Sequence, residues 1–123
     1  MISPDDAFQF IDNDGAKVWL QNGVRHRDGA PAVVYENGTE LWYQHGLFHR
    51  DDGPAIINHN STVYWYKHGK FHRTDGPAII WPNGSVHWYI DNQRISSRQK
   101  YKRLTGISDE QLTFLILKYG DIT

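Results

Sequence analysis

The amino-acid sequence predicts a mainly β protein: a single-sheet antiparallel β-meander of four 23-residue repeats, followed by a C-terminal helical segment. Three observations lead to this prediction. Four of the five Trp residues recur at intervals of 23, at positions 19, 42, 65 and 88. Asn-Gly pairs, the strongest short-range hairpin signal, separate short β-branched runs. Four of the seven Leu lie after residue 103, where helix-capping signals also appear.

Length and composition already narrow the class of protein. The 123 residues suffice for one domain that needs no covalent or metal crosslink. The absence of Cys excludes disulfide scaffolds, Cys-ligated zinc and thiol chemistry. A net charge of −1 provides no overall attraction to nucleic acid or anionic membranes. Because neither a signal peptide nor a long apolar run is present, we expect a soluble, cytoplasmic protein that binds no membrane.

Several residue types besides Trp share the 23-residue register. They are His26, His49 and His72, Arg27, Arg50 and Arg73, Pro31, Pro54 and Pro77, and Ala32, Ala55 and Ala78. A period of this length is typical of architectures in which each repeat packs mainly on its neighbours. We therefore assign residues 1–95 to the repeat sheet and residues 96–123 to a helical cap of the same domain.

Each repeat is predicted to contain two antiparallel strands and a connecting arm. In the copy that begins at Pro54, residues 55–57 form the first strand and residues 62–67 the second, with a turn between them. His68-Gly69 then turns the chain into the arm. Repetition of this unit gives a meander from about residue 8 to residue 95.

Side chains alternate along a strand, so the Trp of each repeat faces one side of the sheet. Tyr43, Tyr66 and Tyr89 face the other side. Cross-strand packing of aromatic pairs would explain both rows. The Tyr row has a second interpretation, because a single-layer sheet cannot bury both faces and an exposed aromatic row marks a binding surface.

Two helices are predicted after the sheet. Ser108 and Gln111 form a capping-box pattern and Gly120 supplies a C-terminal stop, which predicts a helix over about residues 109–119. A shorter helix over about residues 97–105 is ended by Gly106. Because the ends of repeat stacks and exposed edge strands need protection, we expect the pair to cover one end or one face of the meander.

The repeat resembles the MORN repeat in Gly69-Lys70-Phe71-His72 followed by Pro82-Asn83-Gly84. It is more similar to a MORN-like repeat of uncharacterised phage and bacterial proteins, with the pattern His-Arg-x-Asp-Gly-Pro-Ala at residues 49–55 and 72–78. The resemblance covers about residues 14–95. It implies a repeat sheet that serves as an interaction surface and, for a phage protein, modulation of a host factor in the host cytoplasm.

The arms bring repeated His, Arg and Asp residues to one edge of the sheet. We expect no metal site, because equivalent His residues lie roughly 9.6 Å apart whereas zinc ligands converge within about 2.1 Å. A motif copied in every unit is typical of a structural role: Asp-Gly-Pro forms a turn, Arg pairs with Asp or carbonyls, and His binds the next arm. A ligand-facing ladder and a catalytic His–Asp pair are the alternatives.

Two groups of residues are candidates for binding. The first is a binding surface on the Tyr row and the arms, made of Tyr43, Tyr66, Tyr89, Arg27, Arg50, Arg73, His49 and His72. The second is a basic patch after the sheet, made of Arg94, Arg98, Lys100, Lys102 and Arg103. This patch either docks to phosphate or an acidic partner, or is a solvated helix face. It contrasts with an acidic start, made of Asp5, Asp6, Asp12 and Asp14.

These observations predict a non-enzymatic interaction protein that binds another protein and needs no cofactor. The alternative is a ligand-binding module that holds a nucleotide or nucleic acid between the Tyr row and the Arg residues of the arms. A hydrolase-type enzyme using the His and Asp of one arm ranks third. An exposed final strand would also allow a homodimer through edge-to-edge pairing.

Overall fold

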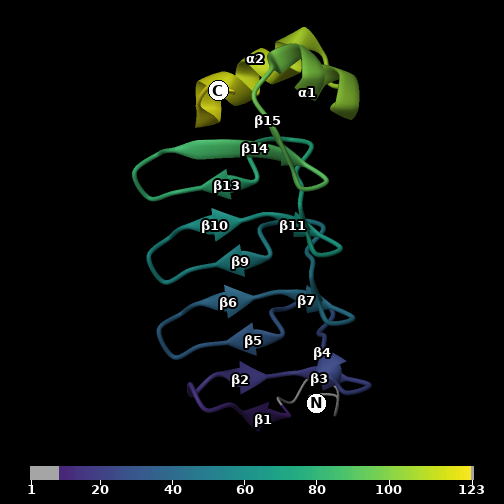
Figure 1. Cartoon of the computed structure of the whole chain (residues 1–123). Coiled ribbons are helices and arrows are strands. Elements are labelled where there is room, and N and C mark those ends of the chain that lie inside the picture. Colours follow the sequence, from purple (N-terminus) through teal and green to yellow (C-terminus); the bar gives the residue numbers. More distant parts are fainter. Residues whose placement is uncertain (1–8, 123) are drawn as a thin grey trace.

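The computed structural model describes residues 9–122 and confirms the predicted fold class, a mainly β chain with an antiparallel meander followed by two helices (Figure 1). Asp5 and Asp6, half of the predicted acidic start, lie outside the described residues. Within residues 9–122 no helix is both long and apolar enough to cross a membrane.

In the described part of the chain, nine strands form the main sheet, and each is antiparallel to its neighbours. In spatial order they are β1 (Phe10–Ile11), β2 (Lys17–Val18), β5 (Val33–Val34), β6 (Glu40–Leu41), β9 (Ile56–Ile57), β10 (Val63–Tyr64), β13 (Ile79–Ile80), β14 (Val86–Ile90) and β15 (Gln93–Ile95). Since the spatial order follows the chain order, successive repeats stack along one axis (Figure 1).

Three short hairpins lie beside the main sheet and form separate two-stranded sheets. They are β3 (Leu20–Gln21) with β4 (Val24–Arg25), β7 (Tyr43–Gln44) with β8 (Leu47–Phe48), and β11 (Tyr66–Lys67) with β12 (Lys70–Phe71). Their turns have two residues with positive φ, as at His45 (51°) and Gly46 (80°), which is the geometry that suits a two-residue hairpin.

The strand predicted over residues 62–67 is divided at Trp65, between β10 and β11. The Trp65 backbone N–H donates to the Ala78 carbonyl at 2.7 Å, outside the regular ladder. Trp19 and Trp42 make the same bond to Ala32 and Ala55. The three Ala side chains are fully buried. Their small size allows each arm to approach the backbone of the Trp at which the strand is interrupted.

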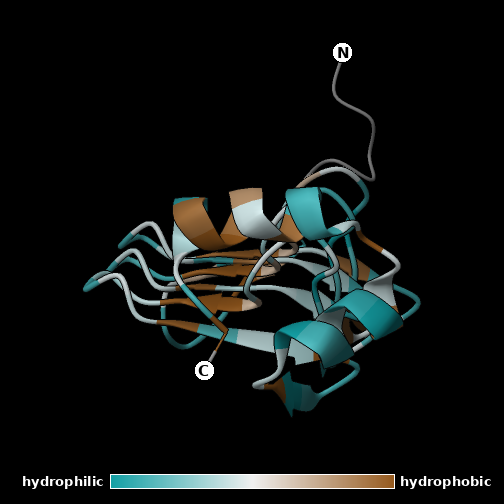
Figure 2. Cartoon of the chain, turned by 90° about the horizontal axis from the view of Figure 1, so that it is seen from above, coloured by the Kyte–Doolittle hydropathy of each residue, from teal (hydrophilic) through white to brown (hydrophobic). Residues whose placement is uncertain are grey.

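The two helices cover the end of the stack beyond β14 and β15 (Figures 1 and 2). They are α1 (Arg98–Thr105), with Ser97 as N-cap, and α2 (Asp109–Tyr119), with the predicted capping box of Ser108 and Gln111. Their buried residues share one core with the last repeat, made of Trp88, Ile90, Ile95, Tyr101, Leu112 and Ile122. The predicted helices and their start and stop signals are confirmed.

Tyr101 is the central residue of this cap. Its ring meets Trp88 edge to face, with centroids 4.9 Å apart. Its hydroxyl donates to the Arg73 carbonyl at 2.7 Å and accepts from the Gly76 N–H at 3.2 Å. Burial raises the pKa of Tyr101 to about 12. The first helix is therefore fastened to the last arm as well as to the last strand.

Candidate functional site

The arms are the segments that run from the His to the Ala of the motif, at residues 26–32, 49–55 and 72–78. Each arm places its Arg over the Trp of the same repeat. The guanidinium carbon lies 3.9 Å from the ring centroid in the pair Arg27–Trp19. The distance is 3.7 Å in Arg50–Trp42 and 3.8 Å in Arg73–Trp65. In all three repeats the Arg follows the Trp by eight residues. The cations therefore cover the Trp faces by cation–π contact instead of pointing into solvent.

The same Arg residues also hold the turn of their own arm. Nη1 of Arg50 donates to the Pro54 carbonyl at 3.3 Å, and Nε donates to Asp52 at 3.1 Å. Arg73 repeats both bonds, and Arg27 repeats the bond to its Pro carbonyl. A Cβ atom at Gly53 would lie only 2.7 Å from the Arg50 guanidinium carbon. The Gly of the motif therefore provides the space in which the Arg lies.

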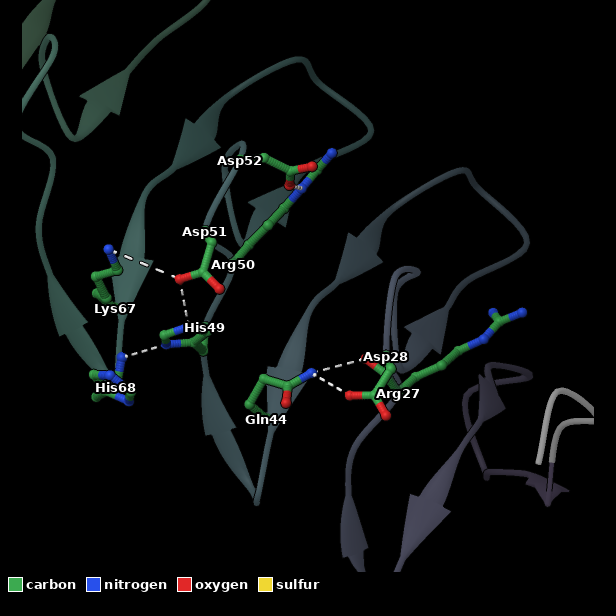
Figure 3. A network of polar contacts seen from close by, with 9 residues as sticks. All are labelled: Arg27, Asp28, Gln44, His49, Arg50, Asp51, Asp52, Lys67 and His68. Carbon is green, nitrogen blue, oxygen red and sulfur yellow. Dashed lines mark hydrogen bonds and ion pairs between the residues drawn. The ribbon is translucent and has the colours of Figure 1, made fainter.

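The His residues join each arm to the next repeat. Nδ1 of His49 accepts the backbone N–H of His68 at 2.9 Å, and Nε2 lies 2.9 Å from an Asp51 oxygen (Figure 3). His26 makes the same two contacts one repeat earlier. Nδ1 of His72 accepts the N–H of Asp91, but Thr74 replaces the Asp partner. The bond to the next repeat agrees with the structural interpretation of the motif, whereas the His–Asp contact is the pairing that the catalytic alternative expects.

Internal pairing of the cations leaves the carboxylates on the outside of the arms. Asp28, Asp51, Asp52 and Asp75 have side chains that are 73–85% exposed. Figure 3 shows Asp28, Asp51 and Asp52 on the first two arms, with Gln44 donating to Asp28 and Lys67 near Asp51. Among the described residues, no group of three or more His, Asp or Glu is placed to hold a metal ion. The arms thus present an acidic edge.

Three hollows follow this edge and share residues with one another. The first lies between the first two arms and has a volume of about 370 Å³. The second lies one repeat further and shares Arg50 and Asp51 with the first. A third, of about 390 Å³, lies between the last arm and α2 and shares Thr74 and Asp75 with the second. The middle hollow is small, about 50 Å³, and we call this row of neighbouring hollows, from Asp28 to Phe114, the arm groove.

The predicted binding surface is divided between the arm groove and a second face. His49, Arg50, Tyr66, His72 and Arg73 line the arm groove. The other three predicted residues do not line it; these are Tyr43, Tyr89 and Arg27. Tyr43 instead lines a shallow groove on the side hairpins, beside the exposed Leu47. The structure therefore does not unite the Tyr row and the arms in one site.

The Tyr row is part of a longer aromatic stack. Its rings follow in the order Tyr43, Phe48, Tyr66, Phe71 and Tyr89, with successive centroids 4.4–5.1 Å apart. Tyr43 is buried, Tyr66 and Tyr89 are half-buried, and burial raises the pKa of Tyr66. Sequence reasoning missed the two Phe residues, although they too lie 23 apart. The row is a packed ladder between hairpins, as its first interpretation expected.

The predicted basic patch is partly neutralised inside the cap. Arg98 makes two hydrogen bonds to the Asp121 carboxylate, at 3.0 and 2.7 Å, and Lys102 pairs with Asp109 at the start of α2. Arg94 lies on β15, whereas the four other cations of the patch lie on α1; these are Arg98, Lys100, Lys102 and Arg103. The patch therefore helps to join α1 to α2 and the residues that follow it.

Comparison with known proteins does not add a relative to this description. No family model matches the chain, and neither the curated proteins nor the solved structures contain a significant match. The arm groove and the surface of the cap are therefore the features from which a function can be inferred.

Proposed function

We propose that the protein is a non-enzymatic interaction protein that binds another protein along its stacked arms. One observation supports this most: the three hollows follow one another along the arms and neighbouring hollows share lining residues, as an extended polypeptide ligand would require. The resemblance to MORN-like repeats of phage and bacterial proteins fits a host factor as the partner, in the host cytoplasm.

The nucleotide or nucleic-acid alternative receives less support from the geometry. Phosphate recognition needs available cations, but Arg50 and Arg73 already bind a Trp face, an Asp and a Pro carbonyl within their own arms. The groove edge carries exposed carboxylates, which repel phosphate. The Tyr rings that would stack on bases already stack on Phe48 and Phe71.

The hydrolase alternative meets a similar difficulty at the His–Asp pairs. A general base must offer a free lone pair to a substrate proton. In His26 and His49, Nδ1 accepts a backbone N–H and Nε2 binds an Asp oxygen, so both ring nitrogens are occupied. The repeated contacts support a structural role for these side chains.

Site-specific photocrosslinking tests the proposal. A benzophenone amino acid replaces Gln44 in the arm groove and, as a matched control, Glu36 in the exposed loop between β5 and β6. In lysate of the host, we expect a discrete protein adduct from position 44, absent at position 36 and reduced at least fivefold by the additional change Asp51→Asn. Equal labelling at both positions, or thermal stabilisation by a nucleotide panel without any protein adduct, would reject the proposal.

A further inference from the structure

The second helix has apolar side chains on both of its sides. Leu112 is buried against the last repeat, whereas Phe114 is 64% exposed and Leu117 is 82% exposed on the outer side. The brown segment of α2 in Figure 2 marks this apolar helix at the end of the stack. A helix that is apolar all round is normally buried, and grouped apolar side chains on a surface mark an interaction site. The outer side of α2 therefore lacks a cover among the described residues.

A groove opens directly beside this exposed side. Ile107, Phe114 and Leu115 supply its apolar part, while Asp75 and Glu110 supply acidic groups. Asp75 belongs both to this groove and to the last arm, so the apolar end continues into the acidic edge. The surface is thus polarised, with an apolar anchor site at the α2 end and carboxylates at repeat intervals beyond it.

We propose that this surface binds an extended basic segment of the partner protein, with an apolar residue anchored beside Phe114 and Lys or Arg residues following along the arms. This inference rests on the proposed function and specifies the chemistry of the partner. The carboxylates of Asp75, Asp51 and Asp28 belong to successive arms and are 73–81% exposed, so each can meet a ligand cation besides the basic side chain that it already contacts. Their charge selects a cationic ligand, and the apolar groove at one end sets its direction.

Repeat geometry also sets the spacing of the cations. Two strands per repeat place Asp28 and its equivalent Asp51 roughly 9.6 Å apart, and the same holds for Asp52 and its equivalent Asp75. Three residues of an extended polyproline-II chain advance about 9.3 Å. A ligand with a basic residue at every third position therefore meets one arm with each cation, while clustered cations meet only one. Spacing of the basic residues becomes a testable property of the partner.

A second copy of this chain fits the groove less well. Pairing α2 with its copy would use 11 residues, or about 16 Å of helix, and a stable interface needs about 1,200 Å² of buried surface. The basic residues of α1 do not provide an extended ligand either, because Arg98 and Lys102 are paired within the cap. Charge complementarity therefore favours a different polypeptide.

Fluorescence anisotropy with three synthetic peptides tests the inference. The first peptide carries a Phe-Leu anchor followed by Arg at every third position, the second has the same composition with its Arg residues adjacent, and the third has Glu in place of Arg. We expect the first to bind, with at least fivefold weaker binding of the second and no measurable binding of the third. Raising the salt concentration should weaken binding of the first.

Paired variants locate the peptide on the surface. Phe114→Ser should weaken binding at least tenfold, whereas Leu47→Ser, a comparable exposed apolar change on a side hairpin, should leave it unchanged. Glu110→Lys should weaken binding more than Glu36→Lys, which introduces the same charge elsewhere. Thermal melts of all four variants check that the fold persists, since all four side chains are at least half exposed or lie in exposed positions.

Several results would overturn the inference. These are equal binding of the first and third peptides, unchanged binding after Phe114→Ser, or a protein that sediments as a dimer and becomes a monomer with Phe114→Ser. A protein adduct at position 44 that persists at full yield in Phe114→Ser would also reject the α2 anchor, but it would retain the proposed function. Absence of any adduct at position 44 in the protein that carries the crosslinker and no other change would instead reject the proposed function itself.

Discussion

The arms and the helical cap cover equivalent Trp residues of the repeats with different chemistry. Trp42 and Trp65 are each covered by an Arg eight residues later, whereas the equivalent position after Trp88 is Ser96. Tyr101 of α1 covers Trp88 instead. Where an Arg covers the Trp, the carboxylates of the arm face solvent. Where the cap covers Trp88, the apolar outer side of α2 faces solvent. The difference shows why the two parts offer different surfaces to one partner.

Truncating Tyr101, the central residue of the helical cap, should produce the largest loss of stability. Tyr101→Ala deletes a fully buried ring and its bonds to the last arm, so we expect about 3–5 kcal/mol of destabilisation. Tyr101→Phe retains the ring but leaves the Gly76 N–H unpaired, at a cost of about 1–3 kcal/mol. Urea unfolding followed by Trp fluorescence measures both. A loss below 1 kcal/mol for Tyr101→Ala would mean that the cap contributes little to the stack.

Alkaline pH should weaken the contact between the cap and the last arm. Burial raises the pKa of Tyr101 from 10.0 to about 12, so folding favours the protonated hydroxyl. The stabilisation is complete below pH 10 and is lost as the pH rises from 10 through 12, by about 2–3 kcal/mol in total. Unfolding free energies at pH 9, 10, 11 and 12 measure this loss. The unfolding free energy of Tyr101→Phe should change less with pH over the same range. Parallel curves for the two proteins would contradict the assignment to Tyr101.

Changing the Gly that makes room for Arg50 tests the arm. Gly53→Ala places a Cβ 2.7 Å from the guanidinium carbon, so Arg50 must leave Trp42 or the turn must shift, at about 1–3 kcal/mol. In the background of Arg50→Ala the same change should cost little. The double-mutant cycle, measured by urea unfolding, isolates this coupling. Additive effects would show that the Gly serves the turn and not the Arg.

A smaller effect is expected from the His that links two repeats. His49→Ala leaves the His68 N–H without its acceptor, which costs about 1–2 kcal/mol. Gln can reach neighbouring groups with an amide oxygen, so His49→Gln should recover part of this loss. Hydrogen exchange at the His68 amide should accelerate in the Ala variant. An unchanged free energy of unfolding in His49→Ala would contradict a structural role for this contact.

How much of this could be predicted differs between the arms and the cap. The 23-residue spacing shows which residues are equivalent, and the motif chemistry led to the His bond with the next repeat and the Arg bond with Asp. The break of the strand at Trp65 could not be predicted, because alternation continues through Tyr64, Trp65 and Tyr66 and only the approach of the buried Ala78 turns the chain there.

The candidate site was predicted less completely than the fold. Spacing placed His, Arg and Asp on one edge but could not show which of them face solvent, since that depends on Arg50 lying over Trp42. The aromatic stack was half predicted: the Tyr residues were identified, but the intervening Phe48 belongs to a hairpin that had been assigned to the arm. Phe114 was missed because the helical spacing of Leu112, Leu115 and Ile116 predicts a single apolar stripe, to which Phe114 does not belong.

The smallest predicted effect concerns the exposed ion pair that closes the cap. The hydrogen bond from Arg98, with the N–H of Ile122, holds the pKa of Asp121 below its usual range. A lowered pKa in the folded chain means that the stabilisation is present above the ordinary carboxyl pKa and is lost as the pH falls through it. Because solvent screens this pair, Asp121→Asn should flatten the acid limb of the unfolding curve only slightly and leave the stability at pH 7 nearly unchanged. A loss as large as that of His49→Ala would show that the cap depends on this charge pair and not on the packing of Tyr101 against Trp88.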